Sequence, residues 1–219
     1  MNKPSLILLF ISIFNPCIWK IFQLNIFLAI LLIITSFLLF NLLSKHEFSP
    51  KYLIVTIIIF CILSVIGVKL GYDQDLKKLK FYEEIQLDGR NKYYSKELGR
   101  LFLNRYSLNY YKNYNPYLYK FQHNFFSVLD PNLYFFSSHP RERPGINEFE
   151  KFPSFYSGLF IIGVIYILQF QPLLAIIYFL SAALISGFIS PGFELGPILF
   201  FPFVVTLTAL GVIHLLRQL

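Results

Sequence analysis

The apolar and polar residues of this chain are sorted into long, separate runs. Residues 21–43, 52–68 and 152–193 contain no charged residue, whereas most charges fall between Asp73 and Lys151. An α-helix needs about 20 apolar residues to cross a hydrocarbon core of about 30 Å. The pattern therefore predicts an all-α polytopic membrane protein with about six transmembrane helices. A small, mostly helical extracytoplasmic insert is expected between the third and fourth of them.

We expect three regions along the chain. They are N-terminal membrane segments at residues 1–70, a polar, tyrosine-rich insert at residues 71–152, and three C-terminal spans at residues 153–219. The first apolar run, residues 5–19, is short and is broken at Asn15-Pro16. It is either a short kinked span or a helix lying in the membrane interface, and two full spans follow it.

The last third of the chain divides into three predicted spans. Gln171 and Pro172 separate residues 155–170 from residues 173–189, and the final span covers residues 198–216. Small residues spaced four apart let helices approach closely in a membrane. Four residues in the second of these spans have that character: Ala182, Ala183, Ser186 and Gly187.

The insert has helical rather than strand periodicity. We predict one helix from Asp73 to a stop at Asp88-Gly89, and a second helix over residues 95–108. Asn115-Pro116 predicts a turn. The insert is expected to rest on the bilayer as a small cap, with its tyrosines at the level of the headgroups.

The distribution of basic residues predicts the orientation. The formal net charge is +7. With six spans, one side of the membrane carries the basic residues Lys3, Lys45, Lys51 and Arg217 in its short loops and at the termini. The other side carries Lys20 and Glu194. The positive-inside rule then places both termini in the cytoplasm and residues 71–152 outside, most simply across the cytoplasmic (inner) membrane.

The segment His139-Pro-Arg-Glu-Arg-Pro-Gly145 holds the densest set of reactive side chains. Arg141 and Arg143 offer planar guanidinium groups that suit a phosphate, and are the predicted lipid- or phosphate-binding residues. His139 and Glu142 are the candidate acid–base catalysts. The alternative is a structural role in which the arginines pair with neighbouring glutamates or lipid phosphates and hold the insert to the membrane.

Glu194 is the third catalytic candidate. It is the only acidic residue after Glu150, and on the six-span arrangement it shares a side with the His139–Gly145 segment. It pairs with an arginine there, acts with the arginines on a substrate, or is a solvated turn residue.

Two functions fit these features. The first is a non-catalytic subunit or scaffold of the cell envelope, whose tyrosine-rich insert docks a protein partner. The second is an enzyme or binding protein that acts on a lipid-linked phosphate or glycan through the His139–Gly145 segment. No G-x-S-x-G, C-x-x-C, Walker or H-E-x-x-H motif occurs, so we predict no cofactor and no metal site. We expect membrane lipids as partners. We expect no binding of nucleic acid, because the insert is nearly charge-balanced.

Overall fold

The structure is a computed structural model that describes residues 3–44, 50–73, 76, 81–99, 104–136, 151–190, 195 and 197–218. Within these ranges the regular structure is helical, and no strand longer than the isolated bridge between Tyr72 and Ile189 occurs. The described helices are α1 (Lys3–Ile13), α2 (Pro16–Leu24), α3 (Ile26–Ser44), α4 (Pro50–Gly71), α5 (Phe81–Leu98), α6 (Arg105–Asn109), η3 (Tyr110–Tyr114), α7 (Asn115–Val128), α8 (Asn132–Phe135), α9 (Tyr156–Phe170), α10 (Pro172–Ser186), η4 (Ile198–Phe200) and α11 (Phe201–Gln218).

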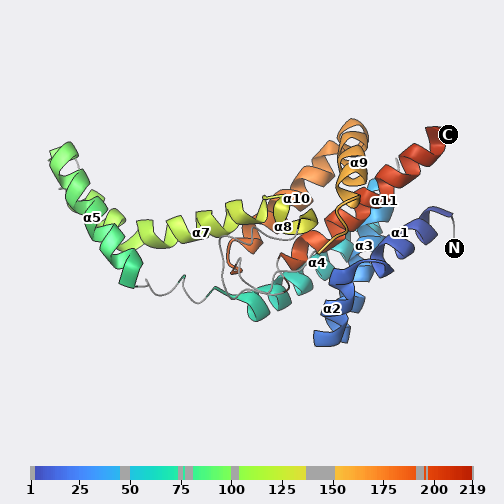
Figure 1. The fold of residues 1–219 in the computed structure, drawn as a ribbon, viewed down its shortest axis with the longest axis horizontal. Helices are drawn as coiled ribbons and strands as arrows, with labels where there is room; N and C mark the ends of the chain where they lie inside the picture. The colour runs from blue at the N-terminus through green and yellow to red at the C-terminus, as the bar shows by residue number, and fades with distance from the viewer. Residues whose placement is uncertain are drawn as a thin grey trace.

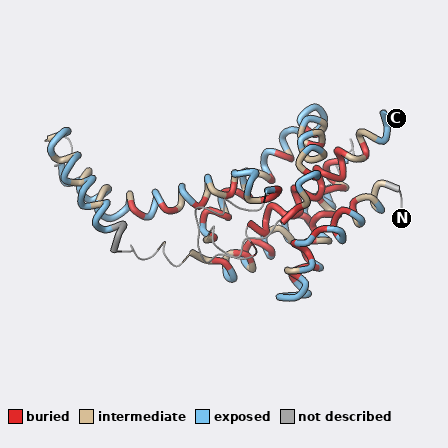
Figure 2. Tube along the Cα trace, viewed as in Figure 1, coloured by how far each residue is buried: buried red, intermediate tan, exposed pale blue. Residues whose placement is uncertain are grey.

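Helix α11 forms the centre of an apolar bundle (Figures 1 and 2). Its residues are buried almost continuously from Phe201 to Gly211, and it packs against α9, α3 and α1. A chain segment without charges can be enclosed by other helices at no desolvation cost. Its two buried hydroxyls donate to backbone carbonyls, Thr206 to Ser36 at 3.2 Å and Thr208 to Val204 at 2.8 Å.

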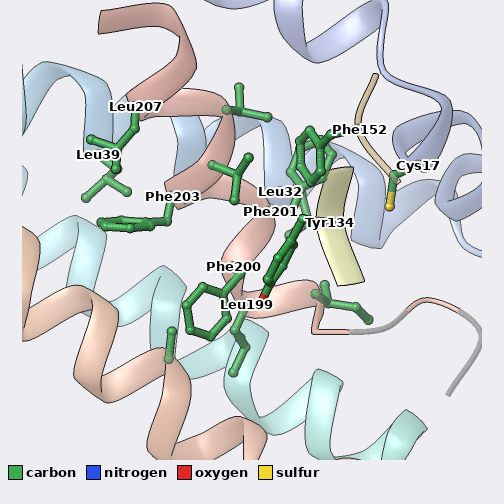
Figure 3. Packing of buried hydrophobic residues seen from close by; sticks show 14 of the residues in the cluster. Cys17, Leu32, Leu39, Tyr134, Phe152, Leu199, Phe200, Phe201, Phe203 and Leu207 are labelled. Atoms are coloured by element: carbon green, nitrogen blue, oxygen red, sulfur yellow. The ribbon is translucent and has the colours of Figure 1, made fainter. Parts of the chain in front are cut away.

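The aromatic residues at the start of α11 lie against α8 and the segment that leads into α9. Tyr134 contacts Phe200 with ring centroids 5.8 Å apart, and Phe152 contacts Phe201 at 5.6 Å (Figure 3). Offset and tilted aromatic pairs of this kind add about 0.5–1.5 kcal/mol to their burial. The cluster therefore fixes the short helix α8 to one end of the bundle.

Helices α1, α3, α9 and α11 meet at one end of the bundle, and α4 and α10 end at the other. At one end, Pro4, Ser44, Tyr166 and Arg217 line a common pocket, which brings together the start of α1 and the later parts of α3, α9 and α11. At the opposite end, the last residues of α4 and α10 are joined by backbone bonds, Asp73 N–H to the Phe188 carbonyl at 3.0 Å and Ser190 N–H to the Gly71 carbonyl at 2.8 Å. Both termini lie at the first end (Figure 1).

Among the described residues, three helical segments are long and apolar enough to cross a membrane: Ile26–Ser44, Pro50–Gly71 and Ile198–Gln218. A fourth crossing is formed if α1 and α2, which meet at a 65° bend, act as one broken span. Helices α9 and α10 are apolar but have only 15 residues each. Helix α4 turns a broad face of isoleucine and valine outward, which is favourable only against lipid or another apolar surface. The chain is a membrane-embedded helical protein.

The predicted break in the first apolar run is confirmed. The Asn15 side chain accepts a hydrogen bond from Cys17 N–H at 2.8 Å, and Pro16 occupies the first turn of α2. These are the usual features of a helix start. The predicted start of the next span is wrong: α2 continues through Lys20 to Leu24, so the uncharged run 21–43 is divided at Asn25 and α3 begins at Ile26.

Three predicted boundaries in residues 71–152 are wrong. Helix α5 passes through Asp88-Gly89 and ends at Leu98, where Gly99 has a φ of 51°. The helix predicted over residues 95–108 is therefore divided, and α6 begins only at Arg105. A mid-helix glycine costs about 1 kcal/mol, which the other residues of α5 offset, whereas a positive φ at the residue after a helix favours glycine. The predicted turn at Asn115-Pro116 is instead the first turn of α7, where proline is tolerated.

Helices α5 to α7 form an elongated arm rather than a compact cap. Helix α7 extends away from the bundle, and α5 crosses its far end (Figure 1). Most of the arm is exposed, and α7 buries about one residue per turn along its length, namely Pro116, Lys120, Asn124 and Val128 (Figure 2). The helical character predicted for this region is confirmed in the described residues.

Candidate interaction surface on the helical arm

The outer part of the arm is one continuous helical segment with a widened turn. Asn104 starts α6 by accepting a hydrogen bond from Tyr106 N–H at 3.2 Å. Helix η3, which spans Tyr110–Tyr114, has π-helical geometry, and the Asn113 side chain amide donates to the Asn109 side chain at 2.6 Å along it. Such π-helical turns occur frequently at functional sites. The widened turn sets the direction in which the neighbouring tyrosines project.

Aromatic contacts hold α5 against this segment. The rings of Tyr94 and Tyr111 lie 5.7 Å apart, and the Arg90 guanidinium carbon lies 5.2 Å from the centre of the Tyr119 ring. A guanidinium over an aromatic face is stabilised by about 0.5–1 kcal/mol at an exposed site. The space that remains between the two elements is about 50 Å³, beside Leu87 and Pro116. It is too small for an organic ligand.

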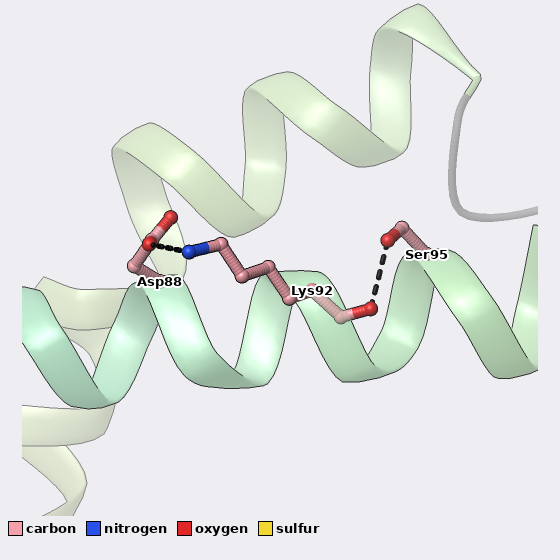
Figure 4. A network of polar contacts seen from close by, with 3 residues as sticks. All are labelled: Asp88, Lys92 and Ser95. Atoms are coloured by element: carbon pink, nitrogen blue, oxygen red, sulfur yellow. Dashed lines mark hydrogen bonds and ion pairs between the residues drawn. The ribbon is translucent and has the colours of Figure 1, made fainter.

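The exposed face of α5 carries a short polar network. The Lys92 ammonium lies 2.8 Å from an Asp88 carboxylate oxygen, and the Ser95 hydroxyl donates to the Lys92 carbonyl at 2.8 Å (Figure 4). The hydrogen bond to Asp88 raises the pKa of Lys92, and the Asp88 charge adds to that effect. An exposed pair four residues apart supports the helix only weakly. This network stabilises α5 and has no features of a reactive site.

Tyrosine is the residue type that distinguishes the arm surface. Among the arm residues whose burial the structure describes, six tyrosines are exposed: Tyr93, Tyr106, Tyr110, Tyr114, Tyr117 and Tyr119. The Tyr106 side chain is 83% exposed. Residues 105–128 also contain Arg105, Lys112 and Lys120 and no acidic residue. The exposed tyrosines with Arg105 and Lys112 are called the tyrosine surface below; Lys120 is buried and is not part of it.

The inner end of α7 is fixed to the bundle by buried polar contacts. The Asn124 side chain amide donates to an Asp73 carboxylate oxygen at 2.9 Å and to the Gly187 carbonyl at 3.2 Å. Asn124 therefore joins α7 to the ends of both α4 and α10. Phe121 packs beside it, with its ring 5.0 Å from that of Phe188. Any side chain at position 187 would collide with Phe121, because an added Cβ would lie 2.5 Å from that ring.

A second set of contacts holds α8 and the chain that returns to the bundle. The Tyr134 hydroxyl donates to the Val128 carbonyl at 2.7 Å, and Phe152 N–H donates to the Tyr134 carbonyl at 2.9 Å. The Lys151 ammonium donates to the Leu133 carbonyl at 3.1 Å. Burial, and then the charge of Asp130, raises the pKa of Tyr134 well above its usual value. These contacts and those of Asn124 hold the arm where α7 and α8 meet the bundle.

The predicted catalytic and phosphate-binding residues lie outside the described residues. They are His139, Arg141, Glu142, Arg143 and Glu194. The described residues that flank them lie at the arm end of the bundle: Phe152 bonds to Tyr134 after residues 137–150, and Ser190 bonds to Gly71 before residues 191–194. Their predicted roles remain predictions.

Sequence reasoning missed the residues that position the arm. Asn124 looks like one more asparagine in a stretch rich in that residue, and only its distant partners Asp73 and Gly187 reveal its role. Arg90 and Tyr94 lie on one face of α5 four residues apart, and this spacing was a usable signal for a helix contact.

Among the described side chains, no group of three histidines, cysteines or carboxylates could hold a metal ion. Comparison with known protein families, with curated proteins and with solved structures finds no match.

Proposed function

We propose that this protein is a non-catalytic subunit or scaffold of the cell envelope whose helical arm binds a protein partner. The membrane bundle anchors the arm, and the tyrosine surface is the docking site. The observation that carries the proposal is the exposure of six tyrosines on an arm that extends from the bundle.

Tyrosine suits a docking role for physical reasons. Its large ring buries much area with the loss of only two side-chain torsions, and its hydroxyl keeps a hydrogen-bond partner when water leaves. Tyrosine and arginine are therefore enriched among the residues that dominate binding energy. Soluble surfaces rarely expose so many aromatic rings on one short element without a partner. The fixed base of the arm lowers the conformational entropy that is lost when the partner binds.

The charge of residues 105–128 indicates the chemistry of the partner, whereas α5 carries both acidic and basic side chains. Arg105 and Lys112 are exposed on a segment without carboxylates. A partner that presents acidic side chains together with an apolar or aromatic patch would complement this surface. We therefore assign the tyrosine surface to an acidic protein partner.

The membrane arrangement forms part of the proposal. Helices α1 with α2, α3, α4, α9, α10 and α11 would make six crossings, with the two short helices α9 and α10 accommodated by local thinning of the bilayer. Arg217 lies at the end with the termini, and in the sequence Lys3, Lys45 and Lys51 fall at the start of α1 and around the α3–α4 connection. This distribution favours a cytoplasmic location for that end. The arm would then extend outside the membrane, where an envelope protein can reach it.

Site-specific photocrosslinking tests the docking role. Tyr106 and Tyr114, each replaced separately by the photoreactive tyrosine analogue benzoylphenylalanine, should crosslink in the source membrane to one discrete protein. The same group at Ile57, on the outward apolar face of α4, should crosslink to lipid only. Lys112→Glu in the Tyr114 variant should reduce the protein crosslink several-fold, whereas Lys112→Arg should leave it unchanged, because arginine keeps the charge.

Two results would overturn the proposal. One is the absence of any protein crosslink at both arm positions in native membranes. The other is a crosslinked product of exactly two copies of this chain, which would make the arm a dimer contact rather than a docking site for a different protein.

A further inference from the structure

The end of the bundle that holds the termini contains a small pocket. Its volume is about 120 Å³, and it opens among α1, α3, α9 and α11. The lining residues are Pro4, Phe40, Ser44, Tyr166, Leu210, Ile213, His214 and Arg217. This pocket is far from the tyrosine surface, since the arm leaves the opposite end of the bundle (Figure 1).

The polar side chains of the pocket are all able to donate hydrogen bonds. Arg217 is exposed near the end of α11 and offers five N–H groups. The half-buried His214 ring lies 5.1 Å from the Tyr166 ring, and its Nε2 lies 3.0 Å from the Gln218 side chain nitrogen. These contacts fix the imidazole and leave Nδ1 for another partner. The Ser44 hydroxyl completes the set.

No carboxylate is present on the helices that form the pocket. Helices α1, α3, α9 and α11 contain no aspartate or glutamate, so Arg217 has no acidic neighbour on them. The deeper wall is apolar, because Phe40, Leu210 and Ile213 are buried there. A positive rim over an apolar wall at the end of a membrane bundle complements an amphiphile with a negative head.

We propose that this pocket binds the phosphate group of a membrane phospholipid. Arg217 contacts two phosphate oxygens through its planar guanidinium, and Ser44 and His214 donate to the remaining oxygens. The volume admits a phosphate and its adjoining glycerol carbons but not a large glycan headgroup. The lipid would tie the ends of four helices together on the side of the bundle opposite the arm, and this binding is independent of the arm and its partner.

Native mass spectrometry of the full chain in mild detergent tests the site. With phosphatidylglycerol as the probe, the parent protein should retain lipid, and Arg217→Gln should lower the apparent affinity about tenfold. Arg217→Lys should lose part of that affinity, because a lysine keeps the charge but not the planar fork. The matched control is Arg105→Gln, which removes an exposed arginine of the arm and should leave lipid binding unchanged.

Thermal melting without added lipid separates binding from folding. Arg217 is exposed, so Arg217→Gln should melt at the parent temperature. Unchanged lipid affinity in Arg217→Gln would overturn the proposal. Inorganic phosphate is the second probe: if it binds to the pocket as tightly as the lipid does, the site belongs to a soluble anion and the assignment to a phospholipid is wrong.

Discussion

The contact between α9 and α11 depends on two glycines. A Cβ added to Gly163 would lie 1.9 Å from the Leu207 carbonyl oxygen, and one added to Gly211 would lie 2.0 Å from the Leu159 carbonyl oxygen. Backbone cannot move away as a flexible side chain can, so any larger residue would separate α9 from α11. These two positions set how α11 is enclosed.

We therefore expect Gly163→Ala to destabilise the protein by about 2 kcal/mol through overpacking. The measurement is thermal melting of the purified protein in detergent. Gly158→Ala is the control on the same helix: it meets no atom within 4 Å and should keep or raise the melting temperature, because alanine favours helix over glycine. Equal melting temperatures for both variants would contradict the close α9–α11 contact.

The buried Tyr134 hydroxyl gives a prediction about alkaline pH. An unfolded tyrosine loses its proton near pH 10, whereas the folded pKa is raised, first by burial and then by Asp130. Stability from this group is therefore complete below about pH 10 and is lost as the pH rises further, because only the unfolded state ionises there. The melting temperature should fall more steeply between about pH 9 and 11 in the parent than in Tyr134→Phe. Tyr106→Phe, at an exposed site, should keep the parent slope.

At this scale the sequence predicts residue character better than residue partners. The small residues Ala182, Ala183 and Ser186 are fully buried, as their spacing indicated. The decisive glycines of the bundle are instead Gly163 and Gly211, which lie on helices far apart in the sequence. Their role depends on which helices are neighbours in the fold. Local patterns in a single sequence do not show which helices pack together.

At the scale of elements, the junction of α4, α7 and α10 decides the position of the arm. Asn124 reaches both Asp73 and the Gly187 carbonyl, so one side chain connects three helices. Loss of a buried amide leaves its acceptors without that donor, which costs about 1–3 kcal/mol.

We expect Asn124→Ala to lower the melting temperature and to make α7 more accessible to protease than it is in the parent. The control is Gln122→Ala, an exposed position two residues earlier on α7, which should change neither property. Limited proteolysis followed by mass spectrometry locates the cleavage. Protection of α7 that is equal in both variants would show that the arm is held without Asn124.

Element boundaries could be predicted where the chain itself enforces them. Asn15-Pro16 and Gln171-Pro172 end apolar helices at the predicted places, because proline cannot continue the preceding helix. Asp88-Gly89 and Asn115-Pro116 have the same local appearance, yet the helices α5 and α7 contain them. There the contacts of Arg90 with Tyr119 and of Tyr94 with Tyr111 add stability that local propensity does not include.

At the scale of the whole molecule, the positions of the helix ends relate the two proposed sites to each other. The pocket beside Arg217 and the junction at the base of the arm lie at opposite ends of the same bundle. If both ends reach the membrane surfaces, the phospholipid pocket and the tyrosine surface must face opposite compartments. A measurement of which side of the membrane the tyrosine surface faces therefore also determines which side the phospholipid pocket faces.

Cysteine labelling in intact cells measures those sides. The parent background is Cys61→Ala, which removes the exposed thiol, while Cys17 is buried. In that background Tyr114→Cys should react with a membrane-impermeant maleimide in intact cells, because Tyr114 is 61% exposed on the arm. Leu216→Cys, exposed at the end of α11, should react only after the membrane is permeabilised. The physical reason is the concentration of basic residues in the sequence near the end with the termini, because such residues remain on the cytoplasmic side under the positive-inside rule.

Labelling of Leu216→Cys alone in intact cells would reverse the orientation and place the arm in the cytoplasm. Labelling of both positions in intact cells would mean that the bundle does not separate them across a bilayer, and the six-span arrangement would then be wrong.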